Sequence, residues 1–104
     1  MRAAVIVGRG GPEVLSLQER PDPVPGPWEI LVDVEASALN RADLLQRRGF
    51  YPAPTGAPAD VPGLELAGRV VQVGAYVSRW SLGDRVMAIV GGGACASRAV
   101  VHER

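Results

Sequence analysis

Asn40 and Asp43 are the polar residues whose types and spacing best fit a functional site. Asn40 is the only asparagine in the chain, and Asp43 follows it by three positions at the start of a short helical segment. An asparagine before a helix caps it, and a carboxylate in the first turn interacts favourably with the helix dipole. The same amide still has N–H donors for a ligand. Two interpretations stay open: a plain helix start, or a helix start that also forms the floor of a cleft.

A second candidate carboxylate, Glu65, lies between Leu64 and Leu66 in an apolar, strand-like segment. An unpaired carboxylate is costly to bury, so Glu65 must be paired or must reach a cleft. We expect one of the arginines as its ordinary partner. Gly68, in the same segment, indicates a bulge or a close approach of another backbone.

The glycine-rich stretch that follows residues 3–7 has the strand-then-glycine opening of a dinucleotide-binding fingerprint. Glu13 occupies the position of the third glycine, Pro12 interrupts the loop, and a proline-rich stretch follows instead of a helix. These differences predict a plain glycine-rich hairpin without a site for a pyrophosphate.

Cys95 and His102 are the only residues of their types. One cysteine and one histidine exclude an internal disulfide and a four-ligand structural zinc site within this chain, so we predict no metal site. Cys95 follows Gly93 and Ala94, without a neighbouring histidine, and is expected to be a small buried or half-buried residue rather than a reactive thiol. His102 lies two residues from the end, where we expect fraying and no functional role.

The composition limits the class of protein. The chain has 104 residues, the size of one domain, and its 11 basic and 11 acidic residues give no electrostatic reason to expect nucleic acid or an anionic membrane as partner. No aliphatic run is long enough to span a bilayer, and the start lacks the layout of a signal peptide. We therefore expect a soluble, cytoplasmic protein.

The pattern along the chain predicts a mainly β protein. Glycine and proline are frequent, at 13 and 9 residues, which favours short strands and turns. The clearest strand is 30–35, where apolar residues alternate. The one convincing helix is 40–48, with Gly49 as its stop. Further strands are expected at 3–7, 14–17, 64–73, 86–90 (a buried strand) and 96–101, with a loop at 51–62. Five to seven strands and one or two short helices indicate a small, partly open β-barrel.

Read in order, several segments together resemble a known family. They are Gly10-Gly11-Pro12-Glu13-Val14-Leu15, Asn40-Arg41-Ala42-Asp43-Leu44-Leu45, Tyr51-Pro52, Gly63-Leu64-Glu65-Leu66-Ala67-Gly68, Val73-Gly74 and Gly83-Asp84-Arg85-Val86. In this order and spacing they resemble the N-terminal, GroES-like substrate domain of the medium-chain dehydrogenase/reductase superfamily. The most similar branch is the zinc-independent, zeta-crystallin-like quinone oxidoreductases.

The resemblance implies a zinc-free reaction. Zinc alcohol dehydrogenases carry a cysteine where this chain has Asn40 and a histidine where it has Leu64, and neither an amide nor an aliphatic side chain replaces those ligands. In the zinc-free branch, hydride passes from NADPH to a quinone or enone. The resemblance implies that Asn40, Asp43 and Tyr51 are the catalytic residues of the cleft, and that Asn40 also contacts the cofactor.

The resemblance also implies an incomplete catalyst. Residues 1–104 correspond to the substrate domain alone, and the nucleotide-binding domain is absent from the chain. Since a cofactor needs a site to hold it, we expect no useful NADPH binding by this chain alone. We also expect homo-oligomers formed through exposed strand edges and apolar surface around Val70, Val86 and Ile89, with the glycines at 91–93 as a hinge for segment exchange.

Two other classes of function stay open. The chain could be a non-enzymatic binding or assembly module that keeps the barrel, or a subunit of a co-chaperonin-like ring. The latter would rest on shared fold alone, which is a weak argument for function. Assembly into a ring in solution would favour it.

Overall fold

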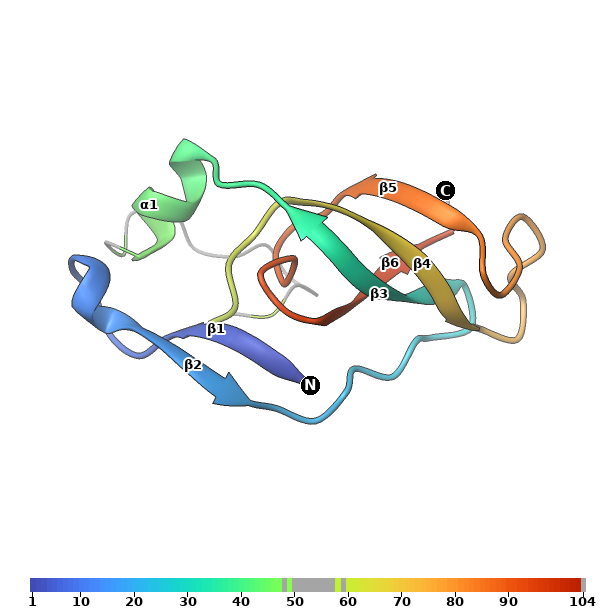
Figure 1. Cartoon of the computed structure of the whole chain (residues 1–104), viewed down its shortest axis with the longest axis horizontal. Helices are drawn as coiled ribbons and strands as arrows, with labels where there is room; N and C mark the ends of the chain where they lie inside the picture. The colour runs from blue at the N-terminus through green and yellow to red at the C-terminus, as the bar shows by residue number, and fades with distance from the viewer. Residues whose placement is uncertain (48, 50–57, 59, 104) are drawn as a thin grey trace.

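The computed structural model describes residues 1–47, 49, 58 and 60–103. Its elements, shown in Figure 1, are β1 (Arg2–Ile6), η1 (Pro12–Val14), β2 (Leu15–Glu19), β3 (Glu29–Ser37), α1 (Arg41–Arg47), β4 (Glu65–Val73), β5 (Arg85–Ile89) and β6 (Arg98–His102). The expected strands and the single convincing helix are confirmed, with boundaries shifted by one or two residues.

The strands form two antiparallel sheets. β1 and β2 make a hairpin, and the other four strands pair in the order β5-β4-β3-β6. A β-bridge between Ala3 and Ala96, which lies just before β6, connects the hairpin to the four-stranded sheet. The sheets do not close on one another, so the expectation of a mainly β, partly open barrel is confirmed. In Figure 1, α1 and the turn of the β1–β2 hairpin lie at the same end of the molecule.

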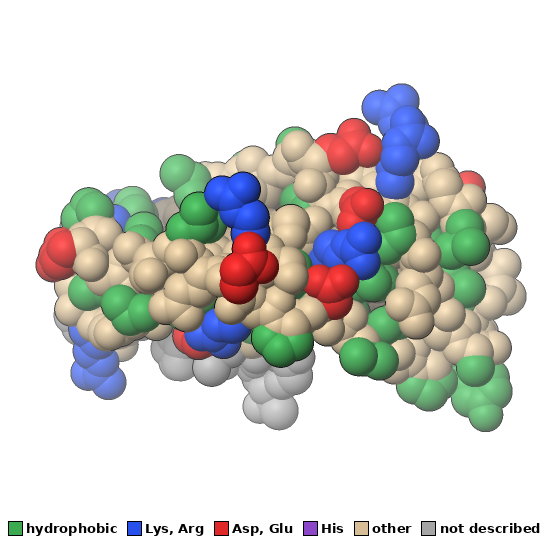
Figure 2. Space-filling model, turned by 60° about the horizontal axis from the view of Figure 1, so that its bottom comes forward, with side chains coloured by type: hydrophobic (Ala, Val, Ile, Leu, Met, Phe, Trp, Pro, Cys, Tyr) green, Lys and Arg blue, Asp and Glu red, His purple; other side chains and the backbone are tan. Residues whose placement is uncertain are grey.

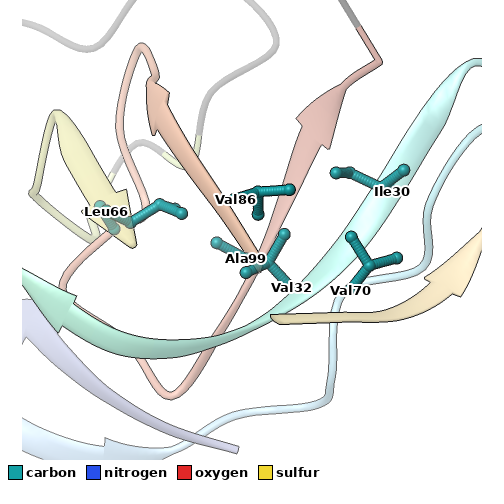
Figure 3. Close-up of a cluster of buried hydrophobic side chains, with 7 residues drawn as sticks. Ile30, Val32, Leu66, Val70, Val86 and Ala99 are labelled. Carbon is teal, nitrogen blue, oxygen red and sulfur yellow. The ribbon is translucent and has the colours of Figure 1, made fainter. Parts of the chain in front are cut away.

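The main core lies on one face of the four-stranded sheet. Strands β3 to β6 each contribute alternate residues to it, as a period of two requires. Figure 3 shows these side chains converging, and the buried set is Ile30, Val32, Leu66, Val70, Val86, Ala94 and Ala99. A smaller cluster joins the hairpin to the rest of the chain and consists of Ala3, Val5 and Val61.

β5 is less buried than its sequence indicates. Val86 is the buried residue of β5 and Ala88 packs against the core, whereas Met87 and Ile89 are 86% and 89% exposed. A short apolar run does not reveal whether both faces of a strand are covered, and β5 lies at the edge of its sheet. The expectation of exposed apolar surface is correspondingly wrong for Val70 and Val86, which are buried, and confirmed for Ile89.

Gly68 allows β3 and β4 to approach closely. The pairing of these strands is irregular at two points, and Gly68 pairs with Val34 between them. A Cβ at Gly68 would collide with the carbonyl oxygen of Asp33 and lie 2.8 Å from Val32 Cγ1. The predicted close backbone approach is therefore confirmed.

The end of the described chain is held in place, so the expected fraying is wrong. Glu103 is only 7% exposed. Its Oε1 accepts the N–H groups of Ser78 and Arg79 at 3.2 and 3.4 Å, and the indole of Trp80 donates to its carbonyl oxygen at 2.7 Å. These bonds tie the end of β6 to the loop between β4 and β5.

The charged side chains are mixed in sign. Figure 2 shows acidic and basic side chains beside one another on one face of the molecule. Arg98, for example, pairs with Asp22 at 2.9 Å and with Asp33 at 2.8 Å. Across the described residues, no helix is long and apolar enough to cross a membrane.

Candidate functional site

The candidate site begins where β3 ends and α1 starts. The Asn40 N–H donates to Asp43 Oδ2 at 2.9 Å, and the Asp43 N–H donates to the Asn40 carbonyl at 3.0 Å. These two bonds close the first turn of the helix. At the other end, Gly49 has a φ of 84° and donates its N–H to the carbonyl of Gln46, which confirms it as the left-handed stop.

Asp43 connects the helix to a second segment. Its Oδ1 accepts the N–H of Gly63 at 3.1 Å in a buried position, and the residue is only 7% exposed. Gly63 has a φ of 109°, and a Cβ there would lie 2.5 Å from the backbone nitrogen of Cys95. Glycine is therefore required at position 63 for three chain segments to meet around Asp43.

The side chain of Asn40 points toward β4. Its Nδ2 donates to Glu65 Oε2 at 3.5 Å, at the long limit of a hydrogen bond. The expectation of an arginine partner for Glu65 is therefore wrong. Glu65 begins β4 and is placed by the sheet beside the start of α1, which no local pattern in the sequence indicates.

A groove of about 430 Å³ adjoins this pair. Three strands form it, β3 with its following residues, β4 and β5, and its lining consists of Ala36, Ser37, Ala38, Glu65, Leu66, Ala67, Met87, Ala88 and Ile89. Most of these side chains are apolar, with the Glu65 carboxylate and the Ser37 hydroxyl as the polar exceptions. Such a lining suits a mainly apolar molecule that has a few polar atoms.

Cys95 is a neighbour of the site that the sequence did not reveal. Burial raises the pKa of its thiol above the ordinary 9.0, the Asp43 carboxylate raises it further, and a hydrogen bond with Ser37 acts in the opposite direction. The half-buried position confirms the expected small, semi-buried residue. Cys95 lies more than 50 positions after Ser37 and Asp43, so only the tertiary fold could show that it is close to them.

The glycine-rich stretch that follows β1 is hydrogen-bonded to the last turn of α1. It forms the turn of the β1–β2 hairpin, as predicted. The Gly10 N–H donates to the Arg47 carbonyl, and Arg47 Nε donates to the Gly10 carbonyl, both at 3.0 Å. The hairpin thereby holds the last turn of α1.

Of the predicted site residues, Asn40 and Asp43 lie together, and Tyr51 falls outside the described residues, where its role stays a prediction. Within the described part of the chain, no group of three or more His, Cys, Asp or Glu side chains is arranged to hold a metal ion.

Known proteins are similar to this chain over most of its length. Residues 26–103 match the alcohol dehydrogenase GroES-like domain. The rat synaptic vesicle membrane protein VAT-1 homolog is 44% identical over 91 residues, covering 86% of this chain and 22% of its own length. A quinone oxidoreductase of Pseudomonas aeruginosa is 47% identical over 77 residues, covering 74% of this chain and 23% of its own.

A similar solved structure is that of the Escherichia coli quinone oxidoreductase complexed with NADPH. It superposes with a TM-score of 0.87 at 34% identity, covering 97% of this chain and 31% of that one. The chain thus spans under a quarter of the length of these two curated relatives and about a third of this solved one. The match over residues 26–103 shows that the chain belongs to the alcohol dehydrogenase GroES-like domain family, within the medium-chain dehydrogenases/reductases.

Proposed function

We propose that this chain is the substrate-domain portion of an NADPH-dependent quinone oxidoreductase, in which hydride passes to a quinone or enone without zinc. The observation that carries the proposal is the half-buried Asn40 amide beside a mainly apolar groove, with its backbone N–H bound by Asp43. The similarity to quinone oxidoreductases over three quarters of the chain supports it.

The residues present suit a nicotinamide and a flat, apolar substrate. The Asn40 amide can both donate and accept hydrogen bonds, as recognition of a carboxamide or a carbonyl requires. The alanine side chains lining the groove leave room for a ring. Amide and aliphatic side chains at Asn40 and Leu64 do not suit zinc. NADPH, when bound, would supply the hydride.

Asn40, Asp43 and Tyr51 would have different roles in the proposed reaction. Asn40 would contact the nicotinamide or the substrate carbonyl. Asp43 is bound by two backbone N–H groups, so its contribution would be to position Asn40 rather than to react. Tyr51 is proposed as a further wall of the cleft on the resemblance alone. The relatives extend well beyond the matched segment, so we propose that their further residues complete the cofactor site.

A chimera tests the proposal. The chain would replace the matching segment of the Pseudomonas aeruginosa quinone oxidoreductase, and quinone-dependent oxidation of NADPH would be measured. We expect activity, and we expect Asn40→Ser to lower kcat/KM at least tenfold while changing helix stability by only a few tenths of a kcal/mol. The bonds that close the first turn use the backbone N–H and carbonyl of residue 40, which serine keeps. The serine hydroxyl has neither the reach nor the donor count of the amide.

Gln72→Ser is the matched control. Gln72 is an exposed amide near the far end of β4, opposite Leu31, and its loss should leave activity unchanged. Equal activity of the Asn40 variant and the parent would mean that the Asn40 side chain has a structural role only. A folded but inactive parent chimera would favour the alternative of a non-enzymatic binding or assembly module.

A further inference from the structure

The outer edge of β5 has unused backbone hydrogen-bonding groups. The Val90 N–H donates to the Leu64 carbonyl at 2.7 Å, and the Asp84 carbonyl accepts the N–H of Val70 at 2.9 Å. In an antiparallel pair, alternate residues bond the same neighbour, so the even-numbered residues 84 to 90 face β4. The N–H and C=O groups of Arg85, Met87 and Ile89 therefore point away from the sheet, and no described residue pairs with them.

The same three residues are exposed through their side chains. Met87 and Ile89 are the two most exposed large apolar side chains of the described chain, and both line the groove of the candidate site. An edge strand with free backbone groups and apolar side chains is a template for another strand. Arg85 is the only charged residue on this edge that could discourage pairing.

We propose that two copies of this chain pair β5 against β5, antiparallel, about a twofold axis at Met87. In this register Met87 faces the partner subunit's Met87, and Arg85 faces the partner subunit's Ile89. All of these residues have outward-pointing backbone groups, so each facing pair can exchange both of its hydrogen bonds. The four-stranded sheets would join into one continuous sheet.

Charge favours this register. Within one copy, β4 and β5 place Arg85 opposite Arg69 and Ile89 opposite Glu65. Arg69 is paired with Glu35 at 3.2 Å, whereas Arg85 has no ion pair with any described residue. Two positive charges directly opposite one another destabilise a sheet, so Arg85 gains from a negative neighbour.

Pairing supplies that neighbour. The partner subunit's Arg85 would lie beside Ile89, in one row with Glu65 on the same face of the joined sheet. Strands are about 4.8 Å apart, so the Cα atoms of this arginine and of Glu65 would be roughly 10 Å apart. The two long side chains can meet over Ile89 at that distance. The twofold axis repeats this contact, so the dimer has two Arg85–Glu65 ion pairs. A shift of the strand register by two residues would remove both of them.

The interface is small and the dimer should be weak. β5 has five residues and offers two large apolar side chains, far less than the roughly 1,600 Å² of a standard interface. The net charge of zero offers no general repulsion. We expect a reversible monomer–dimer equilibrium in sedimentation equilibrium over a hundredfold range of concentration.

Cysteine crosslinking tests the register. In a Cys95→Ser background, Met87→Cys would place two Cα atoms about 5.5 Å apart across the axis, within the range of a disulfide. Arg85→Cys is the matched control, since its own copy would lie roughly 14 Å away. We expect Met87→Cys to form crosslinked dimer at least tenfold faster than Arg85→Cys under mild oxidation. Equal rates would overturn the proposed register.

Charge exchange tests the ion pairs. Arg85→Glu and Glu65→Arg should each weaken dimerisation severalfold, and the double exchange should restore it, with circular dichroism confirming that each variant is folded. Met87→Lys should give a monomer. A wild-type chain that stays monomeric throughout would refute the proposal. A dimer indifferent to Met87→Lys would also refute it, and would point instead to exchange of the segment after Gly93 or to another surface.

Discussion

Asp43 shows how one residue sets the geometry of the candidate site. Both of its oxygens accept backbone N–H groups, one from Asn40 at the helix start and one from Gly63 on the opposite segment. Bonds from N–H groups to an ionised acceptor are stronger than neutral ones, and they leave costly unpaired groups when removed. We infer that Asp43 acts on function through the position of Asn40.

Asp43→Ala should therefore lower the free energy of unfolding by about 2 to 4 kcal/mol, since two charge-assisted hydrogen bonds are lost. Asp43→Asn keeps one acceptor and should cost about half as much. Asp84→Ala is the control. Among the described residues the Asp84 carboxylate accepts only the exposed N–H of Ser81, so its loss should cost under about 1 kcal/mol. Urea unfolding followed by circular dichroism measures all three. A loss for Asp43→Ala no larger than for Asp84→Ala would contradict this role.

The pKa of the Cys95 thiol depends on the charge of Asp43 and can therefore be used to probe the candidate site. Its pKa is raised chiefly by burial and then by Asp43, while the bond with Ser37 favours the thiolate. Asp43→Asn should thus shift the midpoint of the pH profile of thiol alkylation downward, and Ser37→Ala should shift it upward. The rate of iodoacetamide labelling against pH provides the measurement. Shifts of the same sign in both variants would be inconsistent with these causes.

The raised pKa of Cys95 makes the stability of the fold depend on pH. A thiol whose pKa is raised on folding holds its proton more tightly in the folded state. Its contribution to stability is complete below the unfolded pKa of about 9, and it is lost as the pH rises through the folded value.

At the scale of elements, glycines decide how closely the strands meet. Gly68 and Gly83 have different reasons for lacking a side chain. A Cβ at Gly68 would strike the Asp33 backbone, whereas a Cβ at Gly83 would meet nothing within 4 Å, although its φ of 89° favours glycine. The first constraint is steric and the second is torsional.

Gly68→Ala and Gly83→Ala should lower the free energy of unfolding by different amounts. Gly68→Ala must push β3 and β4 apart and should cost roughly 3 kcal/mol or more. Gly83→Ala strains one turn residue and should cost about 1 kcal/mol. Thermal unfolding of both variants measures the difference. Equal losses would mean that β3 and β4 can adjust at their irregular pairing.

At the scale of the whole molecule, we predict that this chain by itself does not hold a pyrophosphate. The glycine turn leads into η1 and β2, and α1 has seven residues with the Asp43 carboxylate in its first turn. A carboxylate at that end opposes a second anion.

Isothermal titration of the chain with NADPH should therefore give a dissociation constant weaker than about 1 mM, a standard free energy of binding smaller in magnitude than about 4 kcal/mol. The intact Escherichia coli quinone oxidoreductase, titrated in the same buffer, is the positive control. A micromolar constant for this chain would reveal a cofactor site that neither the sequence nor the described residues indicate.

The sequence alone determined the features that depend on near neighbours. Alternation predicted β3, Asn40, Asp43 and Gly49 predicted α1, and the glycines before Pro12 predicted the hairpin turn. Each of these signals acts through bonds or torsion angles within a few residues. The order and spacing of the motifs also indicated the family.

The tertiary structure alone decided which distant residues meet. The Asn40–Glu65 bond spans 25 positions and the Asp43–Gly63 bond spans 20. The burial of Glu103 and the exposure of Met87 and Ile89 likewise follow from strand order, which places β5 at an edge and ties β6 to the loop before β5. Local propensity does not indicate such contacts, because they depend on which strands become neighbours. The order of the strands is set by the packing of the whole chain.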